Sequence, residues 1–218
     1  MRRSVRAMAG LLAALVALAL VAACTPTARS ELPREARGAE VHAKRLKEGA
    51  LADELLRKIA PSAPLQGSLD GCLDLRSNHA GYLWRCTMVR AATVTGDDPA
   101  ATLEAQHRLL RDLGCSAYPG LLTTEERLKQ GLQPRFLFDV EYRCPDESLV
   151  MIRFTEPEDP DLSSKVDLGN LQRGPGRGNV ISEQPFSAAA IEQLRSDTSV
   201  KLIMVVAVAR TYWMMPAT

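Results

Sequence analysis

The sequence is poor in aromatic residues, in histidine and in net charge, and each shortage argues against a class of function. Aromatic residues make up 5% of the chain, and its three histidines are His42, His79 and His107. None of them has a second histidine or a cysteine at the spacing of a zinc site. His107 lies on the apolar side of an expected helix, where a hydrogen-bonded core histidine is commoner than a metal ligand. We therefore predict no metal site and no cofactor.

The charges nearly cancel, with 27 lysines and arginines against 26 aspartates and glutamates. If the three arginines at the N-terminus are removed by processing, 24 basic residues remain against the 26 acidic ones. A balanced surface of this kind is not the electrostatic footprint of a protein that binds a polyanion. The composition thus gives no reason to expect a nucleic acid as partner.

The common catalytic motifs are also missing. Ser68 directly follows the first glycine of Gly67-Ser68-Leu69-Asp70-Gly71, whereas a nucleophile elbow keeps one residue between them. Neither Ser-x-x-Lys nor His-Glu-x-x-His occurs, and the glycine-rich stretch at 169–178 lacks the phosphate-binding patterns. A catalytic group assembled from distant residues remains open. The sequence itself points to no enzyme.

The most informative stretch is the N-terminus. Arg2, Arg3 and Arg6 precede an apolar run of about 14 residues at 10–23, which ends in Val21-Ala22-Ala23-Cys24. This arrangement resembles the type II signal peptide and lipobox of bacterial lipoproteins. The resemblance covers residues 1–24 only. It implies that residues 1–23 are removed and that Cys24 is lipidated, which would hold the protein on the extracytoplasmic face of the cell membrane.

Three alternatives compete with this interpretation. An ordinary secretory signal could be cut after Val21-Ala22-Ala23 and leave Cys24 as an unpaired cysteine. The apolar run could be a membrane anchor, although it is shorter than the ~20 residues that a spanning helix needs. Arg2 and Arg3 are similar to the start of a twin-arginine signal, but the residues after them depart from that pattern.

The parity of the cysteines favours the lipoprotein. Five cysteines are present, so assigning Cys24 to the lipid leaves an even set of four: Cys72, Cys86, Cys115 and Cys144. An even set in an exported chain predicts disulfides, and its spacings contain no pair typical of zinc ligands. We therefore expect two disulfides in the mature protein.

The composition divides the chain into a tether and one domain. Residues 24–40 contain almost no large apolar side chain and are expected to form a flexible tether after the lipidated cysteine. Residues 41–218 are expected to form a single domain. It would begin with a helix at 41–59, which Pro61 and Pro64 end.

Two strands follow at 69–76 and 82–95, joined by a polar loop centred on His79. With this centre, Cys72 lies directly opposite Cys86. Opposed residues have Cβ atoms ~4.5–5.5 Å apart, and closer in a non-hydrogen-bonded pair, which is within reach of a disulfide. We therefore predict a Cys72–Cys86 bond.

The second half repeats the order of helix and strands. Asp98 and Pro99 start a helix that Gly114 ends, and a short helix is expected at 124–130. Strands are expected at 136–144 and 149–155. Cys144 points toward the core in this pattern, so Cys115 at the helix end is its natural partner.

The chain ends with a long loop, a helix and a strand. Residues 156–186 are rich in proline, glycine and charge and are expected to be the least structured part of the domain. Ser187 begins a helix at 188–195, and the apolar run at 202–208 predicts a central strand. The fold class is then α+β: an antiparallel sheet of about five strands with helices on one face and two disulfides.

Aromatic residues of the predicted hairpin give the only indication of a recognition surface. Tyr82 and Trp84 fall on one face with Arg76, and Tyr212 and Trp213 could extend it. Tyrosine and tryptophan beside arginine are enriched at binding hot spots. The commoner role of such residues is to cover a helix in a small core, and we leave both roles open.

These observations lead to two hypotheses of different class. The first is a membrane-anchored, non-catalytic lipoprotein that binds an envelope protein or glycan. The second is an envelope hydrolase whose site is assembled only in the fold. A pocket that places a nucleophile beside a base would favour the hydrolase.

Overall fold

The apolar run near the C-terminus forms the central strand of the sheet. The computed structural model describes residues 31–75, 81–117, 139–171 and 179–217. Strand β7 (Leu202–Pro216) lies between β2 (Tyr82–Gly96) and β5 (Leu149–Thr155) and is antiparallel to both. Residues 202–209 are all buried. The prediction of a central strand covered on both faces is confirmed.

The described residues form one sheet of seven strands in the order β3-β4-β5-β7-β2-β1-β6, with antiparallel neighbours. The remaining strands are β1 (Gln66–Asp74), β3 (Ser116–Ala117), β4 (Asp139–Arg143) and β6 (Asn179–Gln184). The prediction of about five strands was too low. The two strands that were missed are β3 and β6. β3 has only two residues, and β6 lies in the segment that composition marked as a loop, so neither shows a recognisable alternation of apolar and polar residues.

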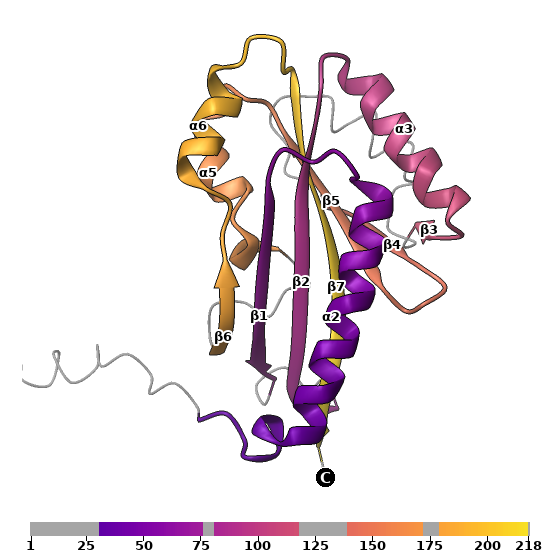
Figure 1. Cartoon of the computed structure of the whole chain (residues 1–218), viewed down its shortest axis with the longest axis vertical. Coiled ribbons are helices and arrows are strands. Elements are labelled where there is room, and N and C mark those ends of the chain that lie inside the picture. Colours follow the sequence, from indigo (N-terminus) through magenta and orange to yellow (C-terminus); the bar gives the residue numbers. More distant parts are fainter. Residues whose placement is uncertain (1–30, 76–80, 118–138, 172–178, 218) are drawn as a thin grey trace, which may run out of the picture. The chain divides into compact units, whose positions relative to one another are not determined.

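Two helices cover one face of the sheet (Figure 1). They are α2 (Ala39–Ile59) and α3 (Pro99–Asp112). The predicted ends of α3 are confirmed: the carboxylate of Asp98 accepts a hydrogen bond from the backbone N–H of Ala101 at 3.0 Å, and Gly114 follows the helix with φ of +77°. Only glycine adopts that backbone conformation without steric cost. The apolar side chains of both helices pack on β2, β4, β5 and β7.

The second face is covered as well, so the prediction of helices on one face was wrong. Here α5 (Leu162–Lys165), the 3-10 helix η2 (Leu168–Asn170) and α6 (Ala188–Ser196) bury apolar side chains against the sheet. The physical reason lies in β7. Its run is apolar at every position, so the odd-numbered side chains Ile203 and Val205 also need cover from water.

The segment at 156–186 is more ordered than its composition indicated. It contains α5, η2 and β6, so its described part is not the long loop that the sequence predicted. Arg153 of β5 helps to explain this order. The residue is 7% exposed, and its guanidinium donates to the carbonyl oxygens of Lys165 at 3.2 Å and Asn170 at 2.9 Å. A buried cation bound to carbonyl groups holds the segment against the sheet.

The predicted tether also ends earlier than expected. A 3-10 helix, η1 (Glu35–Arg37), precedes α2, and α2 begins at Ala39 rather than at residue 41. Ala36 is buried, and Leu32 packs on a small cluster formed by α2, β1, β2 and β7. The domain therefore begins at Leu32, which makes the stretch after Cys24 shorter than the sequence indicated.

Both predicted disulfides are confirmed. Cys72 of β1 lies opposite Cys86 of β2 in the register and is bonded to it, and Cys115 after α3 is bonded to Cys144 after β4. All four cysteines are buried. The first bond lies within one hairpin, whereas the second ties the end of α3 to the sheet.

Several predictions fall outside the described residues. These are the signal peptide, Cys24, Arg76, His79, the helix at 124–130, the first residues of the strand at 136–144 and the glycines at 174–178. Among the helices of the described ranges, none is long and apolar enough to cross a membrane.

Candidate functional site

A groove lies between the start of α2 and the last part of β7. β5 accompanies β7 only as far as Ala209, and in the part of the chain that the structure describes no other strand continues along that side. The space beside β7 is therefore left to η1 and α2. The groove has a volume of about 590 Å³ and is lined by Glu35, Gly38, Ala39, Glu40, Val41, Lys44, Thr211, Tyr212, Trp213 and Met214. We call it the α2–β7 groove.

The lining of this groove is mixed in character. Glu40 and Lys44 form an exposed ion pair of 3.0 Å along α2, while Trp213 is half-buried and Met214 is exposed. A wall with charges of both signs and an aromatic ring suits a ligand that has both polar and apolar parts. An exposed pair of this kind adds little to stability, so both groups are free to exchange their contact for one with a ligand.

Below the groove, a buried carboxylate joins α2 to the sheet. Asp70 of β1 is 1% exposed, and Tyr212 donates a hydrogen bond to its Oδ1 at 2.8 Å. Arg45 of α2 donates to Oδ2 of Asp70 and, at 3.0 Å, to the hydroxyl of Ser182 in β6. Because each oxygen of Asp70 already accepts a hydrogen bond, the arrangement favours a structural role for Asp70 over that of a general base.

Two buried tyrosines carry shifted pKa values. Burial raises the pKa of Tyr212 well above its ordinary value, and the negative charge of Asp70 raises it further. Burial also raises the pKa of Tyr142, whose hydroxyl lies 2.6 Å from Nδ1 of His107. The hydrogen-bonded His107 that the sequence predicted is thus confirmed. Both phenols remain protonated at neutral pH.

These shifts predict a loss of stability at alkaline pH. The stabilisation that the two protonated tyrosines give to the folded state is fully present below about pH 10, which is the pKa of tyrosine in the unfolded chain. It falls as the pH rises further, because only the unfolded chain then releases the protons. We expect the free energy of unfolding to decrease by up to about 1.4 kcal/mol per pH unit for each tyrosine above pH ~10. Urea unfolding at a series of alkaline pH values measures this slope. Tyr142→Phe and Tyr212→Phe should each reduce it, and an unchanged slope in both variants would contradict the assignment.

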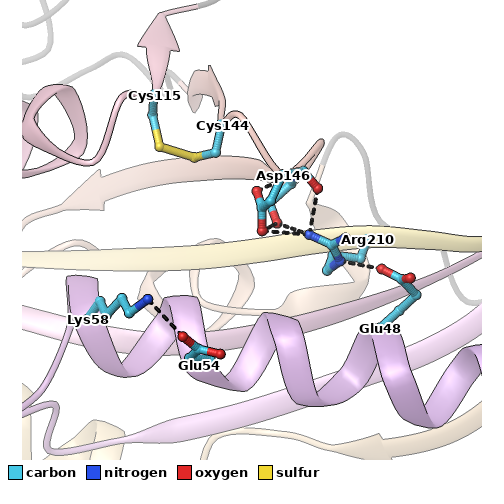
Figure 2. A network of polar contacts seen from close by, with 8 residues as sticks. Glu48, Glu54, Lys58, Cys115, Cys144, Asp146 and Arg210 are labelled. Atoms are coloured by element: carbon cyan, nitrogen blue, oxygen red, sulfur yellow. Dashed lines mark hydrogen bonds and ion pairs between the residues drawn. A yellow bond between two sulfur atoms is a disulfide. The ribbon is translucent and has the colours of Figure 1, made fainter.

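A second polar cluster joins α2 to the turn between β4 and β5. Figure 2 shows Arg210 of β7 between Glu48 of α2 and Asp146 of the turn. The guanidinium contacts Glu48 Oε2 at 2.5 Å and Asp146 Oδ2 at 2.8 Å, and it also donates to the hydroxyl of Ser148. The side chain of Arg210 is 10% exposed. This cluster joins β7 and α2 to the turn between β4 and β5, which begins next to the Cys115–Cys144 bond.

The predicted recognition residues have different environments. Trp84 is 4% exposed and packs beside the Cys72–Cys86 bond, so of the two roles left open it has the one in the core and not the one on a binding surface. Its parity explains this, because Trp84 and Cys86 point to the same face, which α2 covers. Tyr82 is 40% exposed and remains accessible, whereas Arg76 lies outside the described residues. Of the two residues named as an extension, Tyr212 is buried and Trp213 lines the groove.

Sequence reasoning missed the other residues of the site. Glu35, Gly38 and Glu40 were assigned to the tether, where a single Leu32 was the only large apolar residue before the helix. Asp70 left a clearer signal. It has the same parity as Cys72 and therefore lies on the same face of the strand as the predicted Cys72–Cys86 bond. A carboxylate on a buried face of a strand requires a cationic or hydrogen-bonding partner.

Other potential sites are less developed. A second groove of about 660 Å³ lies between the end of α2, the end of β2 and the start of α3. Its carboxylates are Asp97 and Asp98, and Asp98 already caps α3. Within the described ranges, no three residues among histidine, cysteine, aspartate and glutamate lie close enough to hold a metal ion.

Comparison of the chain with models of protein families, with curated proteins and with solved structures gave no match. Its function is therefore inferred from its own residues and geometry.

Proposed function

We propose that the protein is a lipid-anchored domain on the extracytoplasmic face of the cell membrane. One observation carries the proposal: the four cysteines of the domain are bonded to one another, which leaves Cys24 as the cysteine without a partner in the chain. That residue ends the stretch Val21-Ala22-Ala23-Cys24, which resembles a lipobox. Two buried disulfides are also typical of an exported protein.

Within this proposal the domain binds an envelope component rather than transforming one. The two polar clusters that join α2 to the sheet are occupied by their own contacts: Asp70 by Arg45 and Tyr212, and Arg210 by Glu48 and Asp146. The α2–β7 groove instead presents exposed charges and a tryptophan on an open surface. These features support recognition of a protein or glycan with polar and apolar parts.

An envelope hydrolase is the alternative hypothesis. It requires a nucleophile and a base at hydrogen-bond distance beside a pocket. The polar cluster below the groove contains two hydroxyls. That of Ser182 contacts the guanidinium of Arg45, which cannot accept a proton. That of Tyr212 donates to Asp70, but both of these residues are buried. The geometry therefore gives the binding protein the stronger support.

Replacing Cys24 tests the anchor. In its own host, Cys24→Ala is expected to abolish incorporation of a labelled fatty acid, because the diacylglyceryl group that carries the acyl chains is attached to this sulfur. Thr25→Ala is the matched control, since it changes the neighbouring residue and keeps the cysteine. Gel electrophoresis of the labelled protein gives the result directly. Fatty-acid label that persists in Cys24→Ala at the level of the control would rule out the proposed attachment.

A further inference from the structure

We propose that the end of the domain at which its chain begins, at Leu32, rests on the membrane and contacts the interfacial region of the phospholipid bilayer. This anchor-side surface consists of Leu32, Tyr82, Trp213, Met214 and Met215. The inference depends on the proposed lipid attachment and adds to it an orientation of the domain. The bilayer would be a binding partner through the protein surface as well as through the acyl chains.

The first argument is the reach of the chain. Leu32 is the eighth residue after Cys24, and eight residues span at most about 26–29 Å even when fully extended. Leu32 itself is fixed to the domain, because it packs on the cluster that contains Trp84 and Tyr212. The attachment thus keeps this end close to the bilayer. A short covalent connection of this kind gives a high effective concentration, so a weak surface contact is sufficient.

The second argument is the side chains that this end exposes. Met214 is 45% exposed and Tyr82 is 40% exposed, and they belong to the few large apolar or aromatic residues that the described ranges leave exposed. Trp213 is half-buried beside them. Tyrosine and tryptophan favour the boundary between lipid and water, because an apolar ring and a polar group can each reach the environment that suits it.

The topology brings these residues together from distant parts of the sequence. Tyr82 at the start of β2 lies opposite Pro216 at the end of β7, and the backbone N–H of Ala217 donates to the carbonyl oxygen of Gly81 at 3.0 Å. Met214 lines the same groove as Glu35, which follows Leu32 closely in the chain. The first described residues and the last ones therefore share one end of the sheet (Figure 1).

The charges at this end define the type of contact. Six exposed charged residues lie at 31–44, where the domain begins, three of each sign: Arg34, Arg37, Lys44, Glu31, Glu35 and Glu40. Three positive and three negative groups give no net attraction to anionic lipid. The contact is therefore apolar and aromatic, and it should persist at high salt, unlike binding through a basic patch.

Quenching of tryptophan fluorescence by lipid tests this orientation. The purified, lipidated protein is placed in phosphatidylcholine vesicles that contain phosphatidylcholine with a nitroxide near the head group. The chain has two tryptophans, Trp84 and Trp213, and Trp84 is buried. We expect a loss of fluorescence in the wild-type protein that disappears in Trp213→Phe and persists at high salt.

A matched control moves the probe to the other end of α2. Ser62 is exposed just after this helix, which is about 30 Å long, so Trp213→Phe combined with Ser62→Trp places the probe far from η1. The probe at residue 62 should be quenched no more than the Trp213→Phe protein alone. Equal quenching at both ends would show that the domain has no fixed orientation, which would overturn the proposal.

Flotation of the same vesicles separates the two proposals. Protein that floats with the vesicles while Trp213 stays unquenched is anchored but does not rest on this surface, which overturns the orientation alone. Protein that carries no lipid and does not float overturns both proposals. Cross-linking between copies through this end, without quenching, would assign the surface to a second copy of the chain instead.

Discussion

Replacing Asp70 by alanine is expected to lower the free energy of unfolding by about 3–5 kcal/mol. Asp70 is 1% exposed and accepts from both Arg45 and Tyr212. Its loss leaves the buried phenol without an acceptor and leaves the guanidinium without its counter-charge, with only Ser182 as a hydrogen-bond partner in the described part of the chain. The cost of an unsatisfied buried group exceeds the value of an ordinary hydrogen bond. Urea unfolding of the two proteins measures the difference.

Asp53→Ala provides the control for this substitution. Asp53 pairs with Arg90 across the same helix–sheet interface at 3.1 Å, but its side chain is 53% exposed. An exposed pair contributes about 0–1 kcal/mol, so this variant should be nearly as stable as the wild type. If Asp70→Ala cost no more than Asp53→Ala, the buried carboxylate would not stabilise the contact between α2 and the sheet.

Removing the Cys115–Cys144 bond is expected to cost about 3–4 kcal/mol in the chain-entropy account. The residues are 29 apart in the sequence, against 14 for Cys72–Cys86, so the second bond restricts the unfolded chain more. Cys115→Ala combined with Cys144→Ala makes the comparison without placing a polar group in the core. Urea unfolding of this variant and of the wild type measures the difference.

The matched variant replaces Cys72 and Cys86 by alanine. Its expected cost is slightly smaller, about 3 kcal/mol, because the closed loop is shorter. A reducing agent should destabilise each variant only through the disulfide that the variant still contains. A stability that is equal in the wild type, in both variants and after reduction would contradict the role of the disulfides.

The sequence predicted those parts of the fold that depend on local patterns. The position of Cys72 opposite Cys86 followed from the centre of one turn, and the ends of α3 followed from Asp98 and Gly114. The central place of β7 followed from a run without polar residues. In each case a few neighbouring residues determine the structure, so a single sequence is enough to recognise it.

The errors concern features that depend on distant parts of the chain. The order of the segment after β5 depends on Arg153, whose partners are 12 and 17 residues away. The site was hidden for the same reason. Arg45 and Glu48 appear in the sequence as ordinary polar residues of an exposed helix, yet they face the sheet because Asp70 and Arg210 lie there. Only the fold places these charges opposite each other.

The lack of a side chain at Gly49 shows a further limit of local reasoning. A Cβ at this position would lie 3.3 Å from a guanidinium nitrogen of Arg90 and 3.5 Å from the sulfur of Met88. Glycine therefore allows α2 to approach β2 closely. In the sequence, the same residue only lowers the expected stability of the helix.

The intact mass of the protein extracted from membranes tests the lipid anchor most directly. It should be measured with thiol alkylation, before and after reduction. The account predicts a chain that begins at Cys24, carries diacylglycerol on that residue and exposes four thiols only after reduction. A chain that still begins at Met1, or free thiols at Cys72, Cys86, Cys115 and Cys144 before reduction, would contradict it.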